Sequence, residues 1–222
     1  LVEGLGHCSE CHSPRNLLGG IEQKKAFTGA DIDGWFALNL TSNLKTGLGS
    51  WSVDDIATYL KTGADKSKST SLGPMSEVVH NSLSFMTDDD LQAMAEYLKA
   101  LPASSAMSPD HQPDKTLAAG ATTYVDNCSA CHQAQGSGIP GVFPALAGNG
   151  VVLAADANDI LKVVLFGIPV QDGYIAMPGF GDKLSDQQIA DLANYLRSSW
   201  GNGAAVNATA AQVAALRKLP VE

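Results

Sequence analysis

The sequence lacks two features that define large classes of protein: a long apolar run and an excess of positive charge. Its longest apolar runs, at 151–155 and 163–166, fall far short of the roughly 20 residues that a membrane-spanning helix needs. Its 14 Lys and Arg residues are outnumbered by 23 Asp and Glu residues, for a net charge of −9, so no basic stripe is available to neutralise phosphates. We therefore predict no transmembrane segment and no nucleic-acid partner.

Cysteine is also scarce, and all four cysteines fall in two copies of one motif, Cys-x-x-Cys-His, at Cys8–His12 and Cys128–His132. The motif is compatible with a redox dithiol, half a zinc site, a disulfide beside a chance histidine, or c-type haem attachment. A zinc ribbon keeps its cysteine pairs within about 20 residues of each other, whereas these pairs lie in different halves of the chain.

Histidine is rare enough to decide among these alternatives. With five histidines in 222 residues, a histidine directly after a chosen cysteine has a chance of roughly one in forty, and two such events roughly one in two thousand. The histidines therefore belong to the motif. In haem attachment, two thiols on one helical turn bond to the haem vinyl groups, and the next residue's imidazole binds the iron. The pattern favours this interpretation.

The sequence around the two motifs repeats as well. Residues 87–99 and 185–197 match without a gap, and each begins with a Ser or Thr N-cap ahead of a single apolar stripe, which predicts a helix. Residues 55–63 and 159–167 match as a second helix that ends in glycine. We expect an all-α fold of two tandem domains, each with a few helices and long loops around one haem. The expected boundaries are 1–102 and 115–202 for the domains, 103–114 for a proline-rich linker, and 203–222 for a tail helix.

The repeat also indicates a second iron ligand in each domain. Met75 and Met177 lie on Gly/Pro loops before the last helix of each copy, and their offset falls between the offsets of the two flanking helix pairs. We predict both as distal ligands, which would close the iron coordination and suit electron transfer. Met86 and Met94 align with leucines and are predicted to be core residues.

A few further positions have two interpretations each. His80 is the main alternative to methionine as the distal ligand of the first domain, although it has no counterpart in the second. Arg15 either neutralises a haem propionate or lies on the surface. Trp35 and Trp51 either donate their indole N–H groups to propionates or fill the core.

With these residues in place, the chain resembles the multihaem cytochrome c subunits of periplasmic alcohol, aldehyde, gluconate and related dehydrogenases. The resemblance spans nearly the whole chain. In the first half it rests on LVEGLGHCSECHSPRN, GWFALNLTSN, TGLGSWSVDDIATYLKTG and GPMSEVV. In the second half it rests on CSACHQAQGSG, FPALAGN and MPGFGDKLSDQQIADLANYLRSSWGN. Such subunits typically carry three class I cytochrome c domains and pass electrons from a flavin, quinoprotein or molybdenum partner toward membrane quinone.

The resemblance assigns roles residue by residue. It makes Cys8, Cys11, Cys128 and Cys131 the haem anchors, His12 and His132 the proximal ligands, and Met75 and Met177 the distal ligands. It implies that the backbone carbonyl of Pro144 accepts the proton of the His132 imidazole. In the first domain Leu38 replaces the corresponding proline, so the loop geometry there departs from the family pattern. Gly120 and Tyr124 match a helix that packs on the C-terminal helix.

The expected function is therefore electron transfer without bond chemistry of its own. We expect two covalent haem c groups that accept electrons from the catalytic subunit of a dehydrogenase and pass them to a quinone, cytochrome or oxidase of the respiratory chain. Haem attachment and cysteine usage indicate the periplasm, with peripheral contact to the inner membrane. The alternatives are a free-standing dihaem shuttle and a dihaem enzyme of the peroxidase type. The first motif stands too close to Leu1 for a complete preceding helix, so we expect a missing upstream domain.

Overall fold

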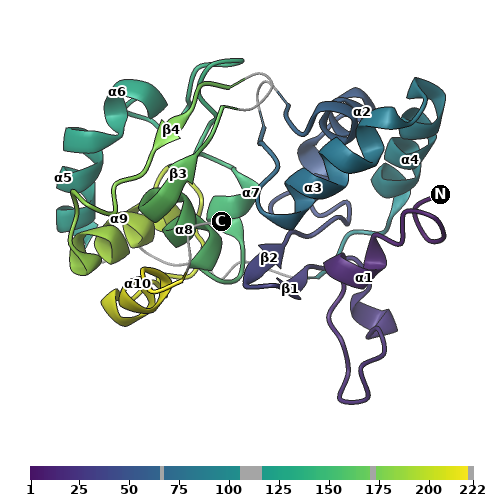
Figure 1. Cartoon of the computed structure of the whole chain (residues 1–222), viewed down its shortest axis with the longest axis horizontal. Coiled ribbons are helices and arrows are strands. Elements are labelled where there is room, and N and C mark those ends of the chain that lie inside the picture. Colours follow the sequence, from purple (N-terminus) through teal and green to yellow (C-terminus); the bar gives the residue numbers. More distant parts are fainter. Residues whose placement is uncertain (66–67, 106–116, 171–173, 220–222) are drawn as a thin grey trace. The chain divides into compact units, whose positions relative to one another are not determined.

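The computed structural model describes residues 1–65, 68–105, 117–170 and 174–219, and it divides the chain into two compact units, 1–107 and 108–222. Each unit is rich in helix (Figure 1). Most of the expected linker, residues 106–114, lies outside the described residues. The two units are taken in turn below.

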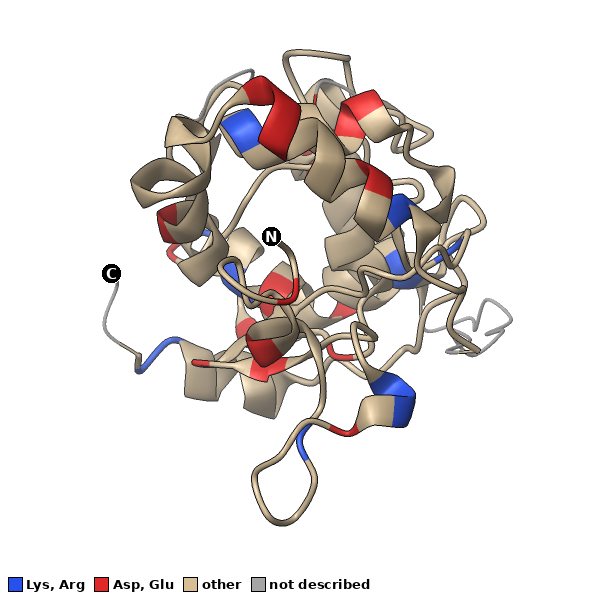
Figure 2. Ribbon diagram, turned by 90° about the vertical axis from the view of Figure 1, so that its right-hand side faces the viewer, with Lys and Arg blue, Asp and Glu red and all other residues tan. Residues whose placement is uncertain are grey.

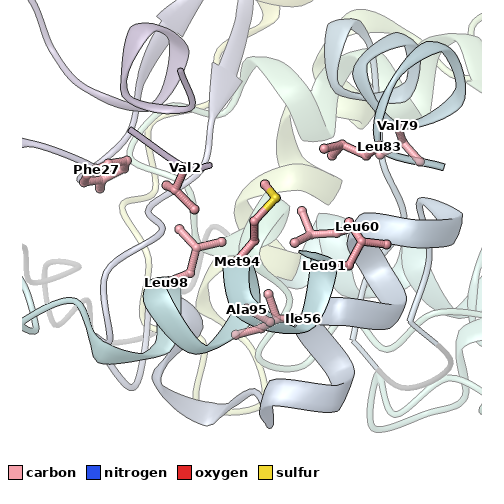
Figure 3. Close-up of a cluster of buried hydrophobic side chains, with 10 residues drawn as sticks. All are labelled: Val2, Phe27, Ile56, Leu60, Val79, Leu83, Leu91, Met94, Ala95 and Leu98. Carbon is pink, nitrogen blue, oxygen red and sulfur yellow. The ribbon is translucent and has the colours of Figure 1, made fainter. Parts of the chain in front are cut away.

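Unit 1 contains the first motif and the hydrophobic core in Figure 3. Its elements, in chain order, are α1 (Ser9–His12), η1 (Gln23–Lys25), β1 (Ala30–Ile32), β2 (Trp35–Ala37), η2 (Leu48–Ser50), α2 (Val53–Thr62), α3 (Pro74–Asn81), η3 (Leu83–Phe85) and α4 (Asp88–Ala100). Helices α2 and α4 pack against each other, and their apolar faces supply most of the cluster drawn in Figure 3.

Both helices that the repeat predicts in unit 1 are present, as α2 and α4, whereas α3 forms where a Gly/Pro loop was expected around Met75. Ser52 caps α2 by accepting a hydrogen bond from the Asp55 backbone N–H, and the Asp55 carboxylate accepts one from the Ser52 backbone N–H. Gly63 then ends α2 in a left-handed conformation, with φ of 78°. Thr87 caps α4 by accepting from the Asp90 backbone N–H, and Met94 on that helix is 2% exposed. The predicted core role of Met94 is confirmed.

Unit 2 contains the second motif. Its elements are α5 (Leu117–Asn127), α6 (Ser129–His132), α7 (Gly150–Leu153), α8 (Asn158–Phe166), β3 (Gly167–Ile168), β4 (Met177–Pro178), α9 (Asp186–Ser198) and α10 (Ala210–Leu216). Ser185 and Gln188 form a capping box that starts α9. Helices α5 and α9 make the most extensive helix pair of the unit.

Helix α5 crosses α9 at Gly120, and the crossing is close. A Cβ at Gly120 would stand 2.2 Å from the Asp191 carbonyl oxygen and 2.7 Å from the Tyr195 Cβ, so only glycine fits. One turn later the Tyr124 ring packs on that of Tyr195, with centroids 5.7 Å apart. The packing expected of Gly120 and Tyr124 is therefore confirmed.

Two short antiparallel strand pairs depart from the expected all-α fold. Strands β1 and β2 pair in the register Ala30 with Ala37, and β3 and β4 pair Ile168 with Met177. Strands of two or three residues are too short to show an alternating pattern, so no periodicity in the sequence predicts them. The fold is helix-rich rather than purely helical.

The tail of the chain packs on unit 2. Within the expected segment 203–222, α10 begins at Ala210 and ends at Leu216, and it buries Val213 and Leu216 beside α9. Arg217 follows the helix, forms an ion pair with Asp186, and donates to the carbonyls of Gly181 and Leu184. In the part of the chain that the structure describes, no helix has the length and apolar content needed to cross a bilayer.

In each unit, one basic side chain near the C-terminal end of α4 or α9 donates mainly to backbone carbonyls ahead of α2 or α8. Lys99 on α4 donates to the carbonyls of Leu48, Gly49 and Trp51. Arg197, its partner in the repeat, is fully buried on α9 and donates to five carbonyls, those of Val152, Ala154, Ala155, Asp156 and Ala205. Burial lowers the pKa of Arg197 to about 10, which leaves it charged at neutral pH.

Candidate haem-attachment sites

Both motifs form the same short helical turn. Cys8 is the N-cap of α1 and Cys128 the N-cap of α6. The backbone N–H of His12 donates to the Cys8 carbonyl at 3.0 Å, and that of His132 to the Cys128 carbonyl at 2.9 Å. All four cysteines are free thiols. Each motif therefore places two thiols and an imidazole on a single turn.

Each motif histidine is oriented by a backbone carbonyl on a distant loop. The Nδ1 of His132 lies 3.0 Å from the Pro144 carbonyl oxygen, as the resemblance implied. The Nδ1 of His12 lies 2.7 Å from the Leu38 carbonyl oxygen. A carbonyl can only accept, so both Nδ1 atoms carry the proton, and Nε2 is left as the metal-binding atom. Replacement of proline by Leu38 in unit 1 has not removed this bond.

The electrostatic setting of both motifs suits metal binding by neutral imidazole. Burial lowers the pKa of His12 and His132, which keeps both rings uncharged at neutral pH. Burial also raises the pKa of Cys8, and it raises that of Cys128 to about 11. Both thiols are therefore protonated at neutral pH.

The first predicted distal ligand, Met75, is held near the start of α3. It follows Gly73 and Pro74, and it is half-buried against the core cluster of unit 1. Gly73 has a φ of 49° and lies against the Trp35 indole, since a Cβ there would meet the ring at 2.6 Å. Trp35 thus supports the Gly-Pro turn that presents Met75, a role that the sequence did not suggest.

The second predicted distal ligand, Met177, is held by a strand pair instead of a helix. It lies on β4 opposite Ile168 and is half-buried. Gly167 lies so close to this strand that a Cβ there would stand 2.3 Å from the Met177 carbonyl oxygen. The two methionines share a position in the repeat but have different backbone supports. Their role as iron ligands stays a prediction.

The structure shows the surroundings of three other residues whose roles the sequence left open: His80, Arg15 and Trp51. His80 is exposed on α3, and its Nδ1 binds the Ser76 carbonyl one turn earlier at 2.7 Å. Arg15 is exposed and forms an ion pair with Glu10. Trp51 packs against the core and against Tyr59, with ring centroids 5.6 Å apart, which supports the core-filling interpretation.

The donor set fits a covalent haem c group better than a protein-only metal site. Each turn supplies two free thiols and one oriented imidazole, which are the groups that haem attachment and proximal ligation need. Among the described residues, no three His, Cys, Asp or Glu side chains gather in a geometry that could hold a metal ion. Haem, when bound, supplies an iron that gains and loses one electron.

These sites and the helix-rich units around them define a cytochrome of the c type. Residues 117–200 match the cytochrome c family model. The cytochrome c-552 of Thermus thermophilus is 35% identical over 110 residues, which cover 44% of this chain and 83% of that protein. The chain belongs to the cytochrome c family.

Among its relatives are cytochrome subunits of dehydrogenases. The chain is 42% identical over 241 residues to the cytochrome c subunit of the quinone alcohol dehydrogenase of Gluconobacter oxydans, which covers 98% of this chain and 50% of that protein. It is 40% identical to the gluconate 2-dehydrogenase cytochrome c subunit of Pantoea cypripedii, over 98% of this chain and 55% of that protein. The chain spans about half the length of these two relatives. Their names describe cytochrome subunits, which are electron-transfer components and not catalytic subunits.

Proposed function

We propose that the chain carries two haem c groups, one in each of two tandem class I cytochrome c domains. Cys8 and Cys11 would anchor the first haem and Cys128 and Cys131 the second. The observation that carries this proposal is the duplication of the whole proximal arrangement. In each unit the thiols share a turn with a histidine whose Nδ1 donates to a carbonyl of a distant loop.

The ligand roles follow from the same arrangement. His12 and His132 would bind iron through Nε2, because Nδ1 is engaged by Leu38 and Pro144. Met75 and Met177 would bind from the other side, since each stands on a backbone segment that a close glycine contact holds in place. A thioether and an imidazole leave no open position on the iron, which suits electron transfer and not peroxide chemistry.

The proposed role is an electron relay between a dehydrogenase and the respiratory chain. The relatives that cover most of the chain include cytochrome subunits of alcohol, gluconate and fructose dehydrogenases, which supports a dehydrogenase as the electron donor. Covalent haem attachment supports a periplasmic location, at the face of the inner membrane where a quinone, cytochrome or oxidase would accept the electrons.

Haem number and ligation can be tested on the purified protein. Intact mass should show two haem groups, and a single haem would contradict the dihaem proposal. Met177→Ala should remove the near-infrared methionine-to-iron band of one haem and leave the other, whereas the control Met86→Ala should leave both. An unchanged spectrum in Met177→Ala would refute the ligand assignment. Strong high-spin signals in the wild-type protein would instead favour the peroxidase-type alternative.

The relay can be tested with the native protein. Membranes from the source organism that are supplied with ethanol, gluconate or fructose should reduce both haems of the added wild-type protein. Reduction by none of a panel of dehydrogenase substrates, together with a free monomer on gel filtration, would favour the free-standing shuttle.

A further inference from the structure

Residues 14–22 project from unit 1 as a narrow loop, which we call the finger. It follows the first attachment turn and is visible below α1 in Figure 1. Leu17 and Leu18 stand at its tip and are 106% and 96% exposed, as fully as side chains can be. Single exposed leucines are common, but two adjacent ones on a projecting tip form an apolar feature that calls for a partner.

The finger is built as a rigid hairpin. Arg15 and Ile21 pair as an antiparallel bridge, and the Asn16 backbone N–H donates to the Gly20 carbonyl at 2.8 Å. The Asn16 carbonyl accepts from Gly19, and its side-chain oxygen accepts from the N–H groups of Leu18 and Gly20. Gly19 takes the left-handed conformation, with φ of 81°, that such three-residue turns require. The backbone that carries the two leucines is therefore held in one conformation, which lowers the entropy cost of binding.

The base of the finger is fixed to the attachment turn. The Glu22 N–H donates to the Pro14 carbonyl at 2.8 Å, and the Gly29 N–H donates to the His12 carbonyl at 2.9 Å. Ser13 is buried and accepts from the Phe27 N–H. A partner that holds the tip of the finger would thus be held in register with His12.

The charge around the finger argues against a membrane as the occupant. Figure 2 shows charged residues at its base and none at its tip. Arg15 pairs with Glu10, and Lys25 pairs with Glu22, so with Lys24 the base has three basic and two acidic residues. Peripheral attachment to anionic lipid uses clusters of about four to eight Lys and Arg residues, whereas this chain has a net charge of −9.

The tip alone is too small to hold two copies of the chain together. Stable association between proteins buries about 1,200–2,000 Å² in total, and two leucines supply a small part of that area. The tip is suited to be one anchor inside a wider interface, of the kind that a permanent subunit partner provides.

We propose that the finger is a docking anchor, in which Leu17 and Leu18 insert into an apolar pocket on the catalytic subunit of the dehydrogenase that reduces this cytochrome. This inference rests on the proposed function. The finger lies beside the attachment turn. The contact that holds the two subunits together would therefore also set the approach of the electron donor to the first haem.

The test compares the haem-loaded full chain with the double variant Leu17→Ser/Leu18→Ser, both tagged and expressed in the source organism. Leu44→Ser is the matched control, because Leu44 is 77% exposed in the same unit but outside the finger. The readouts are the dye-linked dehydrogenase activity that co-purifies, measured with ethanol, gluconate and fructose, and the reduced haem spectrum. We expect the double variant to retain its haem spectrum, while its co-purified dehydrogenase activity falls at least tenfold. Leu44→Ser should lose none of that activity.

Each other outcome contradicts the docking proposal in a distinct way. If the wild-type chain brings down dehydrogenase activity and the double variant brings down as much, the docking proposal fails and the relay stands. If the wild-type chain co-purifies with none, the docking proposal fails, and reduction of the haems by membranes decides separately whether the relay stands. Vesicles of phosphatidylethanolamine and phosphatidylglycerol that bind the wild-type chain but not the variant would make the finger a lipid contact. A wild-type dimer that the variant dissociates would make it a self-association contact.

Discussion

Gly73→Ala should disturb the turn that holds Met75, the predicted iron ligand of unit 1. Gly73 precedes Pro74 and Met75, and its φ of 49° costs an alanine about 1–2 kcal/mol. The new Cβ would also stand 2.6 Å from the Trp35 ring, where ordinary contacts are 3.4 Å or more. Overpacking of this kind costs about 1–3 kcal/mol, so the whole change should cost about 2–5 kcal/mol.

The relief of that clash is expected to move the turn that holds Met75. The oxidised, haem-loaded variant should therefore lose the methionine-to-iron band of the first haem, and the band of the whole protein should fall to about half. Denaturant unfolding followed by circular dichroism measures the loss of stability in the same sample.

Gly19→Ala is the matched control for backbone strain. Gly19 also has a positive φ, of 81°, but a Cβ there would meet nothing within 4 Å. Gly19→Ala should lower the free energy of unfolding by about 1–2 kcal/mol and leave the methionine-to-iron bands of both haems intact. Equal effects of the two variants on stability, with full bands in both, would refute the argument that Trp35 fixes the position of Met75.

Two further predictions concern the packing of unit 2. Arg197→Met should destabilise the unit by about 3–5 kcal/mol, because a buried charged donor is lost and five carbonyls, including those of buried Val152 and Ala154, lose their shared partner. Lys99→Met should destabilise unit 1 by less, since Lys99 is only half-buried and water can replace its ammonium group. Equal losses of stability for Lys99→Met and Arg197→Met in urea unfolding would contradict this. Gly120→Ala should force α5 away from α9 and cost about 1–3 kcal/mol, seen as a lower Tm, and an unchanged Tm would mean that the crossing is looser than 2.2 Å implies.

The sequence predicted the parts of the fold that depend on side-chain pattern. Thr87 and Ser185 mark helix starts because their side chains cap backbone N–H groups, and Met94 aligned with a leucine because both positions face a core. Gly120 was predicted to lie at a helix crossing, and the structure places it there.

Other features depend on contacts that leave no pattern in the sequence. Strands β1 to β4 have two or three residues, which is too short for an alternation to appear. Arg197 looks like a solvent-exposed helix residue in the sequence, and only its collinearity with Lys99 hinted at a shared role. The contact between Trp35 and Gly73 joins residues that are distant in the chain, so neither residue identifies the other.

The bond between each motif histidine and a main-chain carbonyl has a consequence for how such proteins can vary. A carbonyl belongs to every residue, so the acceptor survives when the side chain that displays it changes, as Leu38 and Pro144 illustrate. A substitution at this position can weaken the hydrogen bond only by changing the path of the loop backbone. The proximal hydrogen bond can thus be inherited unchanged while the sequence around it drifts, and any difference in redox potential between the two units would have to be set by other groups.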